Sequence, residues 1–267
     1  LPEKINTHAK KKCIYQARDE YPFPQTVLNN KPVCLKICLD GCYDFFEHAC
    51  LSLLAILYFC FKVKDIMKKL PIEFYDRKDV VQIAKDLLGK IIITKLNGLV
   101  TSGRIVETEA YIGITDKASH SFGGKRTARN EHMYASPGTA YVYICYGMHH
   151  LFNVVTNKQN IPDAVLIRAV EPLQGIDIML QRTGKIKLDN TLTKGPGNVG
   201  KAMGISKDHS GIHLSGNKIF IGEDDWEIDN TIGESKRIGV ESAGLAALYP
   251  YRFFIKGNKY VSGYPNK

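Results

Sequence analysis

Two carboxylates and an aromatic ring share one face of a strand-like run that begins at Gly103 and ends at Tyr111. Because alternate side chains of a strand point to the same face, Glu107, Glu109 and Tyr111 are expected to lie together. A carboxylate buried without a partner is costly, so this face is more typical of a site than of a core. With their Cα atoms about 6.5–7 Å apart, the two glutamates could be the acid pair of a glycosidic-bond hydrolase.

Ion pairing is the alternative explanation for these glutamates, since Arg104, Arg168 or a lysine could neutralise one or both. Other chemistries lack their motifs: the sequence contains no G-x-S-x-G turn, no H-E-x-x-H and no zinc-deaminase pattern. His149 and His150 are adjacent and would point to opposite faces of a strand, so we expect no metal site. The apolar runs around Glu109 contain no lysine that could form a Schiff base.

Tyrosines dominate the second strand-like run of this region. Tyr141 and Tyr143 would share one face, and Tyr146 would lie on the other beside the Gly147 turn. An aromatic at a hairpin tip, flanked by Met148, can act as a wedge between base pairs. Such tyrosines are more often core residues. Together with a basic surface and a carboxylate, however, they favour an enzyme that acts on an extruded base, held between Tyr111 and Tyr143.

The stretch Gly195-Pro-Gly-Asn-Val-Gly200 matches the dinucleotide-binding fingerprint. No buried strand precedes it and no βαβ unit surrounds it, so we expect no nucleotide cofactor. A glycine-rich helix start can also direct N–H groups at a phosphate, here with Lys194 and Lys201 beside it. A helix start without any ligand explains the sequence equally well.

Alternating and helical patterns define the elements that must position these residues. Helices are predicted at 78–88 (capped by Asp76 or Asp79), 175–183 and 195–203, and strands at 90–95, 99–111, 141–146, 151–156, 164–170, 237–239 and 252–256. Asn97-Gly98 predicts a hairpin turn, and residues 112–138 a polar loop. Hairpin-linked strands with interspersed helices indicate an α+β fold. We expect a single catalytic domain with a mostly antiparallel curved sheet, a roll or open barrel, flanked by helices.

The chain has 267 residues, a net charge of +9 and a pI near 9.1, which favours a polyanionic partner. Residues 1–66 hold nine of its 36 Lys and Arg and seven of its 27 Asp and Glu, so most of the positive charge belongs to the rest. The predicted functional domain is therefore 67–267.

Residues 1–66 are predicted to be a leader of doubtful function, poorly ordered or marginally helical. They hold six of the seven cysteines, and Cys34, Cys38 and Cys42 would form one helical stripe without the spacing of a metal site. The uncharged run at 49–61 is too short to span a bilayer. We therefore expect no membrane association. Composition changes at Met67, which resembles a protein start.

The residues from about 70 onward resemble the alkyladenine (3-methyladenine) DNA glycosylase family. The agreement is long and ordered, and it takes in Gly103–Tyr111, His120-Ser121, Gly123-Gly124, Thr127, Arg129-Asn130, Pro137–Thr139, Tyr141–Tyr143, Tyr146–Met148, Asn153, Leu166–Pro172 and Gly195-Pro196. The resemblance implies a monofunctional enzyme of base excision repair, without lyase activity or cofactor. It would hydrolyse the N-glycosidic bond of alkylated or deaminated purines of the 3-methyladenine, 7-methylguanine and hypoxanthine class.

The resemblance also implies roles for single residues. Glu109 would be the general base that activates water, Arg168 would help to hold that water, and Glu107 would become a structural ion-pair partner. The base-binding residues would be Tyr111, His120, Tyr143 and Asn153, with Asn153 discriminating against the 2-amino group of guanine. Tyr146 would fill the gap left by the flipped nucleotide.

Contacts with DNA are expected from Tyr146, Met148, Lys125, Arg126 and Lys194. Lys125-Arg126 stands where the family resemblance predicts one phosphate-contacting arginine, so either residue could make that contact. The expected partner is double-stranded DNA with damaged purines, bound by a monomer in the cytoplasm or at the nucleoid (in the nucleus of a eukaryote). Two rival functions are a non-catalytic binder of damaged DNA and a sugar glycosidase that uses both glutamates. Only DNA binding should weaken steeply with salt.

Overall fold

The computed structural model describes residues 67–229 and 231–263. The leader at 1–66, its cysteine stripe and its apolar run lie outside the described residues.

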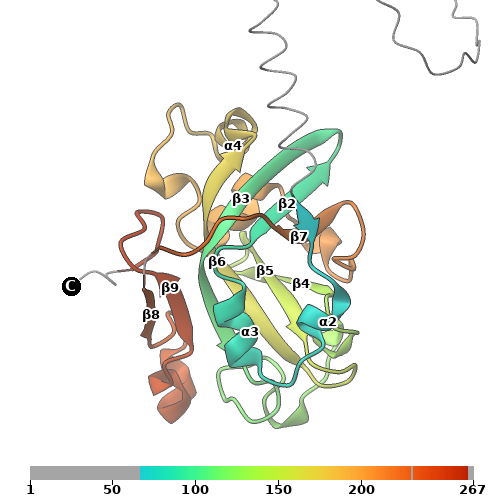
Figure 1. Ribbon diagram of the computed structural model, residues 1–267. Helices are drawn as coiled ribbons and strands as arrows, with labels where there is room; N and C mark the ends of the chain where they lie inside the picture. Colours follow the sequence, from blue (N-terminus) through green and yellow to red (C-terminus); the bar gives the residue numbers. More distant parts are fainter. Residues whose placement is uncertain (1–66, 230, 264–267) are drawn as a thin grey trace, which may run out of the picture. The chain divides into compact units, whose positions relative to one another are not determined.

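An open, curved antiparallel sheet forms the centre of the described chain (Figure 1). Its strands follow the order β1 (Lys68–Lys69), β7 (Ile219–Glu223), β2 (Ile91–Leu96), β3 (Leu99–Tyr111), β6 (Asp163–Gln174), β5 (His149–Thr156) and β4 (Ala140–Cys145). Two further strands, β8 (Ile232–Ser235) and β9 (Arg252–Ile255), form a hairpin, and β9 also pairs with the second half of β3. The predicted α+β fold with a mostly antiparallel sheet is confirmed.

Two hairpins bring the predicted site strands into position. Asn97 and Gly98 both have positive φ, 53° and 75°, as a two-residue turn between β2 and β3 requires. In the β4–β5 hairpin, Tyr146 has a φ of 49° and Gly147 a φ of 71°. Positive φ is uncommon for an aromatic residue. Tyr146 therefore belongs to the turn, and β4 ends one residue earlier than predicted.

The strand β3 is irregular at its first glutamate. Its pairing with β6 shifts between Ile105 and Glu107, and again between Glu107 and Thr108. A bulge bends a strand and redirects its side chains. The bulge lies at the part of β3 that pairs with both β6 and β9. These two neighbouring strands bring polar residues to the carboxylates.

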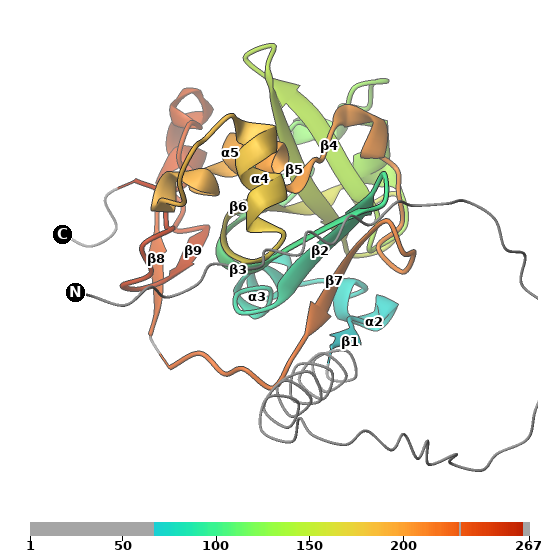
Figure 2. The same ribbon diagram turned by 90° about the horizontal axis from the view of Figure 1, so that it is seen from above.

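Helices cover the sheet, three of them at the predicted positions and one, at Ile72–Tyr75, that the sequence patterns did not predict. They are α2 (Ile72–Tyr75), α3 (Val80–Asp86), α4 (Ile176–Thr183) and α5 (Pro196–Met203). In the view of Figure 2, α4 and α5 lie above β3 and α3 lies below it. The Asp79 side chain, rather than Asp76, caps α3 by accepting a hydrogen bond from the Gln82 amide (2.9 Å). Short 3-10 turns follow at η1 (Phe122–Gly124), η2 (Glu131–Tyr134), η3 (Asn190–Leu192), η4 (Lys207–His209) and η5 (Glu241–Leu248).

One predicted strand is wrong. Residues 237–239 form no strand, and the partner of β9 is β8 instead. Gly239 has a φ of 78°, and the buried Arg237 side chain bonds to loop and backbone groups far away in the sequence. The apolar Ile238 therefore belongs to a loop that borders the site.

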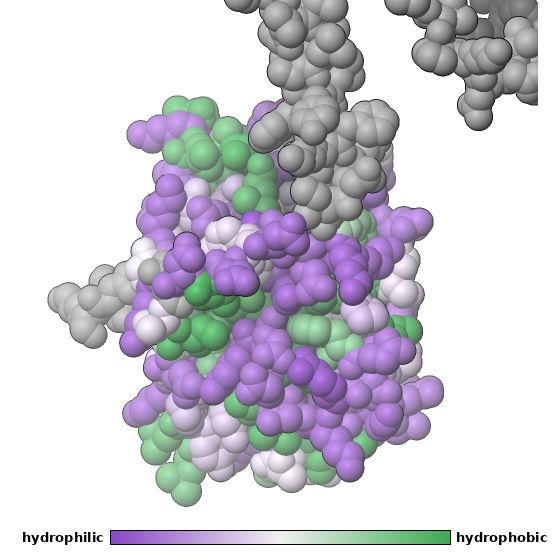
Figure 3. Space-filling view, viewed as in Figure 1, coloured by the Kyte–Doolittle hydropathy of each residue, from purple (hydrophilic) through white to green (hydrophobic). Residues whose placement is uncertain are grey.

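Hydrophilic residues predominate on the face shown in Figure 3, with smaller hydrophobic groups between them. Within residues 67–229 and 231–263, none of the helices has the length and apolar character needed to cross a membrane.

Candidate active site

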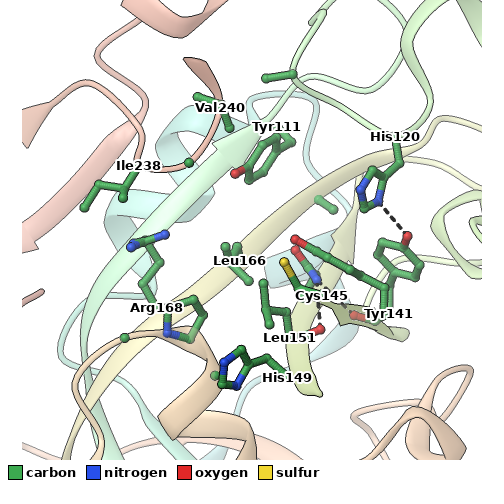
Figure 4. Close-up of a pocket in the computed structure, with 18 of the residues that line it drawn as sticks. Tyr111, His120, Tyr141, Cys145, His149, Leu151, Leu166, Arg168, Ile238 and Val240 are labelled. Atoms are coloured by element: carbon green, nitrogen blue, oxygen red, sulfur yellow. Dashed lines mark hydrogen bonds between the residues drawn. The ribbon is translucent and has the colours of Figure 1, made fainter. Parts of the chain in front are cut away.

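A cavity of about 510 Å³ opens where β3, the β4–β5 hairpin and β6 meet the loop at 238–240 and the start of α5 (Figure 4). Seven of the residues singled out from the sequence line it: Tyr111, His120, Tyr143, Tyr146, Asn153, Arg168 and Lys194. Side chains far apart in the sequence therefore share one space large enough for a small planar ligand.

Glu109 lies behind this wall rather than in it, because its side chain is fully buried. The Tyr111 hydroxyl donates to Oε2 at 2.8 Å. The Ile238 amide donates to Oε1 at 2.8 Å, and Nη1 of Arg168 lies 3.2 Å from the same oxygen. All three donors belong to residues that line the cavity. The carboxylate is thus fixed in orientation directly behind the cavity wall.

Burial raises the pKa of Glu109 above its ordinary value. The guanidinium of Arg168, the Ile238 amide and the Tyr111 hydroxyl oppose this rise, and the neighbouring Glu107 adds to it. A carboxyl group with a raised pKa accepts a proton more readily than an ordinary glutamate. That property suits a general base.

Glu107 has a different environment although it is only two residues away. Its Oε1 accepts hydrogen bonds from Nε of Arg168 (2.8 Å), Nε of Arg252 (2.7 Å) and the Ser262 hydroxyl (2.7 Å). The Ser262 amide donates to Oε2 at 2.7 Å. Burial alone would raise the pKa of Glu107, but the two guanidinium groups and the Ser262 amide lower it below the ordinary value. The ion pair expected with Arg168 is confirmed.

Arg104, the other arginine considered as a glutamate partner, pairs with Asp224 instead (2.7 Å). Arg168 serves both glutamates and also donates from Nη2 to the Ser262 hydroxyl at 3.2 Å. Burial alone would lower the pKa of Arg168, but the two carboxylates raise it further above its ordinary value. A permanent positive charge therefore lies against the cavity beside Glu109.

Aromatic rings form the part of the wall contributed by β4 and the loop before it. The His120 ring packs edge-on against Tyr143, with centroids 4.6 Å apart, and Nδ1 of His120 bonds to the Tyr141 hydroxyl at 2.8 Å. Figure 4 shows this His120–Tyr141 bond, with Tyr111 reaching the cavity from β3. Burial and the nearby Arg129 and Lys125 lower the pKa of His120 to about 4. His120 is therefore neutral at pH 7.

Asn153 is nearly fully buried on β5, and its amide nitrogen donates to the carbonyls of Tyr141 (3.1 Å) and Leu151 (3.3 Å). These bonds hold the side chain rigidly at the cavity wall. At the tip of the hairpin, Tyr146 is 86% exposed and Met148 is 70% exposed. This hairpin projects from the body of the protein in Figure 2.

The basic residues expected near the cavity lie in different places. Lys194 lines it, whereas neither Lys125 nor Arg126 does. Arg126 instead pairs with Glu131 on the surface. Arg129 lines the cavity, with its guanidinium 5.9 Å from the centre of the Tyr143 ring. Arg129 is among the residues that carry the family resemblance, but no spacing argument singled it out.

The glycines of the stretch from Gly195 to Gly200 have packing reasons. Gly195 has a φ of 89°. A Cβ on Gly197 would lie 2.7 Å from the His149 ring, and one on Gly200 would lie 2.1 Å from the His150 carbonyl oxygen. Close contact of α5 with β5 thus requires these glycines. His149 faces the cavity while His150 accepts a hydrogen bond from the Lys207 amide, and the described chain contains no cluster of metal-ligating groups.

Several site residues escaped the sequence patterns. Arg252 and Ser262, the partners of Glu107, and Ile238, the donor to Glu109, come from the last part of the described chain. Ile238 lies within residues 237–239, whose pattern predicts a strand where the structure has a loop. Gly239 was the signal that could have indicated a loop.

An extruded base is bound against aromatic side chains, and hydrolysis of its N-glycosyl bond requires a group that activates water. The cavity here combines aromatic side chains with a buried carboxylate behind its wall, an arrangement that fits a DNA glycosylase, a hydrolase of N-glycosyl bonds. The comparisons with known proteins agree. The chain belongs to the methylpurine-DNA glycosylase family, whose model matches residues 73–259.

Bacterial relatives resemble the same part of the chain closely. A Desulfitobacterium hafniense protein is 45% identical over 203 residues, which cover 73% of this chain and 99% of the relative. A Clostridium perfringens protein is 46% identical over 200 residues (71% and 97%), and one from Chlamydia felis is 44% identical over 191 residues (71% and 97%). Each carries the name "Putative 3-methyladenine DNA glycosylase". The resemblance inferred from the motifs is confirmed.

Proposed function

We propose that this chain is a monofunctional DNA glycosylase of base excision repair. It would extrude alkylated or deaminated purines of the 3-methyladenine, 7-methylguanine and hypoxanthine class and hydrolyse the N-glycosidic bond with a water molecule activated by Glu109. The observation that carries the proposal is the buried Glu109 carboxylate, fixed by three donors directly behind the cavity wall. Residues 67–267 would form the catalytic domain.

The damaged base would lie in the cavity against Tyr111, His120 and Tyr143. Alkylation at N3 or N7 makes a purine cationic, and aromatic faces attract cations by about 0.5–2 kcal/mol. Neutral His120 adds no opposing charge. The rigidly held Asn153 would exclude bases with a 2-amino group in their ordinary position.

Hydrolysis would proceed from the deprotonated form of Glu109. The carboxylate takes a proton from water, the water oxygen bonds to C1′ of the sugar, and the bond from C1′ to the base nitrogen breaks with its electrons passing to the base. A cationic alkylpurine leaves as a neutral molecule, whereas hypoxanthine requires protonation. Arg168 would help to hold the water, because its Nη1 already lies 3.2 Å from Glu109.

Exposed groups around the cavity would bind the DNA. Tyr146 and Met148 protrude from the hairpin and would occupy the space left by the extruded nucleotide. Lys194 and Arg129 border the cavity and would contact phosphates, with Lys125 farther out. Arg126 is a weaker candidate than its position in the sequence indicated, because Glu131 neutralises it. The protein would act as a monomer on DNA in the cytoplasm or at the nucleoid, or in the nucleus of a eukaryote.

Neither rival function is favoured by the site. A sugar glycosidase with two carboxylates needs both of them free to act, but Glu107 is surrounded by two guanidinium groups and Ser262. A non-catalytic DNA binder has no use for a buried carboxylate with a raised pKa.

We expect the full-length chain to release free base from duplexes that contain 7-methylguanine or hypoxanthine and to leave the strands uncut. Chromatography of the released base would measure the reaction, with an undamaged duplex as the control. The substrate is a polyanion, so lesion binding should fall steeply with salt, with a log–log slope near 0.9 per phosphate contact. Strand cleavage, or a covalent DNA adduct trapped by borohydride, would contradict the monofunctional assignment. Lys194, which lines the cavity, would then be the candidate for the amine that forms the adduct.

As the pH is lowered, the rate of base release should fall with a midpoint above pH 4.5, the ordinary pKa of a glutamate. Burial raises the pKa of Glu109, and the carboxyl group cannot accept a proton from water below that pKa. Single-turnover rates on a 7-methylguanine duplex would show this limb, since this base already carries its positive charge. Tyr111→Phe removes a donor to the carboxylate and should move the limb to still higher pH. A limb near pH 4 would instead report His120 and would contradict the assignment.

A further inference from the structure

We propose that the buried ion pair of Arg237 with Asp116 is a positioning device for Glu109, because it fixes both the Ile238 amide and the Tyr111 ring. These two groups are the donors that hold the two carboxylate oxygens. The inference rests on the proposed function and adds two positioning residues to it. Neither residue touches the reacting atoms.

The Arg237 side chain joins three separate segments of the chain. It is fully buried, and its Nη1 donates to the Ala110 carbonyl on β3 at 2.9 Å. Its Nη2 donates to Oδ1 of Asp116 at 2.9 Å and to the Ala246 carbonyl in η5 at 3.0 Å. Nη1 also pairs with the other Asp116 oxygen. The guanidinium thereby ties η5 and the loop after β3 to the end of β3.

Two short connections lead from this guanidinium to Glu109. Ile238 directly follows Arg237, and its amide donates to Oε1 of Glu109 at 2.8 Å. The carbon of the guanidinium also lies 4.7 Å from the centre of the Tyr111 ring, whose hydroxyl donates to Oε2 at 2.8 Å. Both carboxylate oxygens therefore depend on groups that Arg237 holds.

Asp116 orders the other side of the same arrangement. Its Oδ1 accepts a hydrogen bond from the Ala118 amide (3.0 Å), and its backbone carbonyl accepts one from the Ser119 amide (2.8 Å). Ala118, Ser119 and His120 all line the cavity. The ion pair thus holds the loop of the base-binding wall as well as the segment behind Glu109.

Stability alone is a weak reason for this ion pair. Both side chains are buried, and the loss of hydration offsets most of the attraction within such pairs. Nε of Arg237 also lacks a hydrogen-bond partner among the described residues, which is a further cost. The need to place the Ile238 amide and the Tyr111 hydroxyl accurately against Glu109 explains why the ion pair is present beside them.

The chain supplies a control for Arg237 in Arg104, which lies on β3. Arg104 also binds an aspartate through two nitrogens, at 2.9 and 2.7 Å, and donates to the Gly89 carbonyl at 2.8 Å. Its guanidinium lies 4.3 Å from the Trp226 ring. Arg104 does not line the cavity. Arg104 therefore has the same kinds of partner as Arg237, in a pair whose aspartate is more exposed, and it has no connection to Glu109.

The test compares Arg237→Lys with Arg104→Lys in the full-length protein. Lysine keeps the positive charge but cannot donate hydrogen bonds from two planar nitrogens as the guanidinium does. Thermal unfolding would verify that both variants fold. On a 7-methylguanine duplex, we expect Arg237→Lys to lower the single-turnover rate about 10²-fold, as a small misplacement of a catalytic group does. Lesion affinity, measured in the Glu109→Gln background, should fall by a much smaller factor than the rate. Arg104→Lys should excise base at the normal rate.

The pH profile provides a readout that lost stability would not move. A weaker Ile238 hydrogen bond stabilises the carboxylate less, so the acid limb of Arg237→Lys should shift to higher pH. The charged and titratable groups that act on Glu109 from the surrounding elements are Glu107, Tyr111, Tyr143, Arg168 and Arg237. Arg237→Lys alters the charge of none of them, so a shift reports position.

Normal excision with an unshifted limb in folded Arg237→Lys would overturn the inference, and so would equal losses of rate and lesion affinity. Should this variant fail to fold, Asp116→Asn carries the same expectation for the single-turnover rate, because it keeps one acceptor oxygen and the shape. Base release by Glu109→Gln at the normal rate would instead refute the proposed function. The two failures are therefore distinguishable.

Discussion

Glu109→Gln is expected to abolish base release while lesion binding is kept. An amide cannot take the proton of the attacking water, and loss of a general base costs about 10²–10⁴ in rate. The amide oxygen can still accept the hydrogen bond from the Ile238 amide, now made at 2.8 Å. Single-turnover release of 7-methylguanine would measure the loss, and titration of the same duplex would measure binding.

The stability of this variant is the second part of the expectation. Because burial raises the pKa of Glu109 in the folded protein, folding favours the protonated carboxyl. Its contribution to stability is complete below the ordinary pKa and is lost as the pH rises through the raised pKa. Glutamine stays neutral and avoids that loss. We therefore expect Glu109→Gln to unfold at pH 7 at an equal or higher temperature than the unchanged protein.

Two outcomes would contradict the assignment of Glu109 as the base. Release at the normal rate would show that another group activates the water. Loss of both release and lesion binding would show that the carboxylate holds the cavity together instead. His132→Gln is a suitable control, since His132 lies outside the cavity and pairs with Ser210 at the surface.

Glu107→Gln should have the opposite profile, with a large loss of stability and a smaller loss of chemistry. The change removes the charge that neutralises Arg168 and Arg252, and breaking a buried ion pair costs about 3–5 kcal/mol. Urea unfolding would measure the free energy of unfolding. Glu131→Gln, at an exposed pair with Arg126, is the matched control. It should cost far less stability than Glu107→Gln, because solvent screens an exposed pair.

The pH dependence of unfolding gives a further check on Glu107. Its pKa is lowered in the folded protein, so its contribution is present above the ordinary value and is lost as the pH falls through the folded value. The gap between the unchanged protein and Glu107→Gln should therefore narrow in acid. At temperatures where the variant is folded, it should still release base. An equal loss of release in both glutamate variants would instead support paired-acid chemistry.

The strand patterns, the Asn97-Gly98 turn and the helix periodicities predicted the main elements correctly. These features depend on neighbours a few residues away, so the sequence contains the necessary information. The wrong prediction at 237–239 arose because contacts distant in the sequence determine the backbone there. An apolar Ile238 beside Arg237 matches a strand pattern, but a buried ion pair with Asp116, 121 residues earlier in the chain, decides the local backbone.

By itself, the sequence determined the family, the curved antiparallel sheet and the residue types of the cavity, because each is encoded in short-range patterns and ordered motifs. It also placed Glu107 and Glu109 on one face, where spacing makes them equivalent. Only the tertiary structure distinguished them. Arg252 and Ser262 converge on one carboxylate, and Ile238 and Tyr111 hold the other. The pKa of a buried carboxyl depends on these contacts, and most of them come from residues more than a hundred positions away.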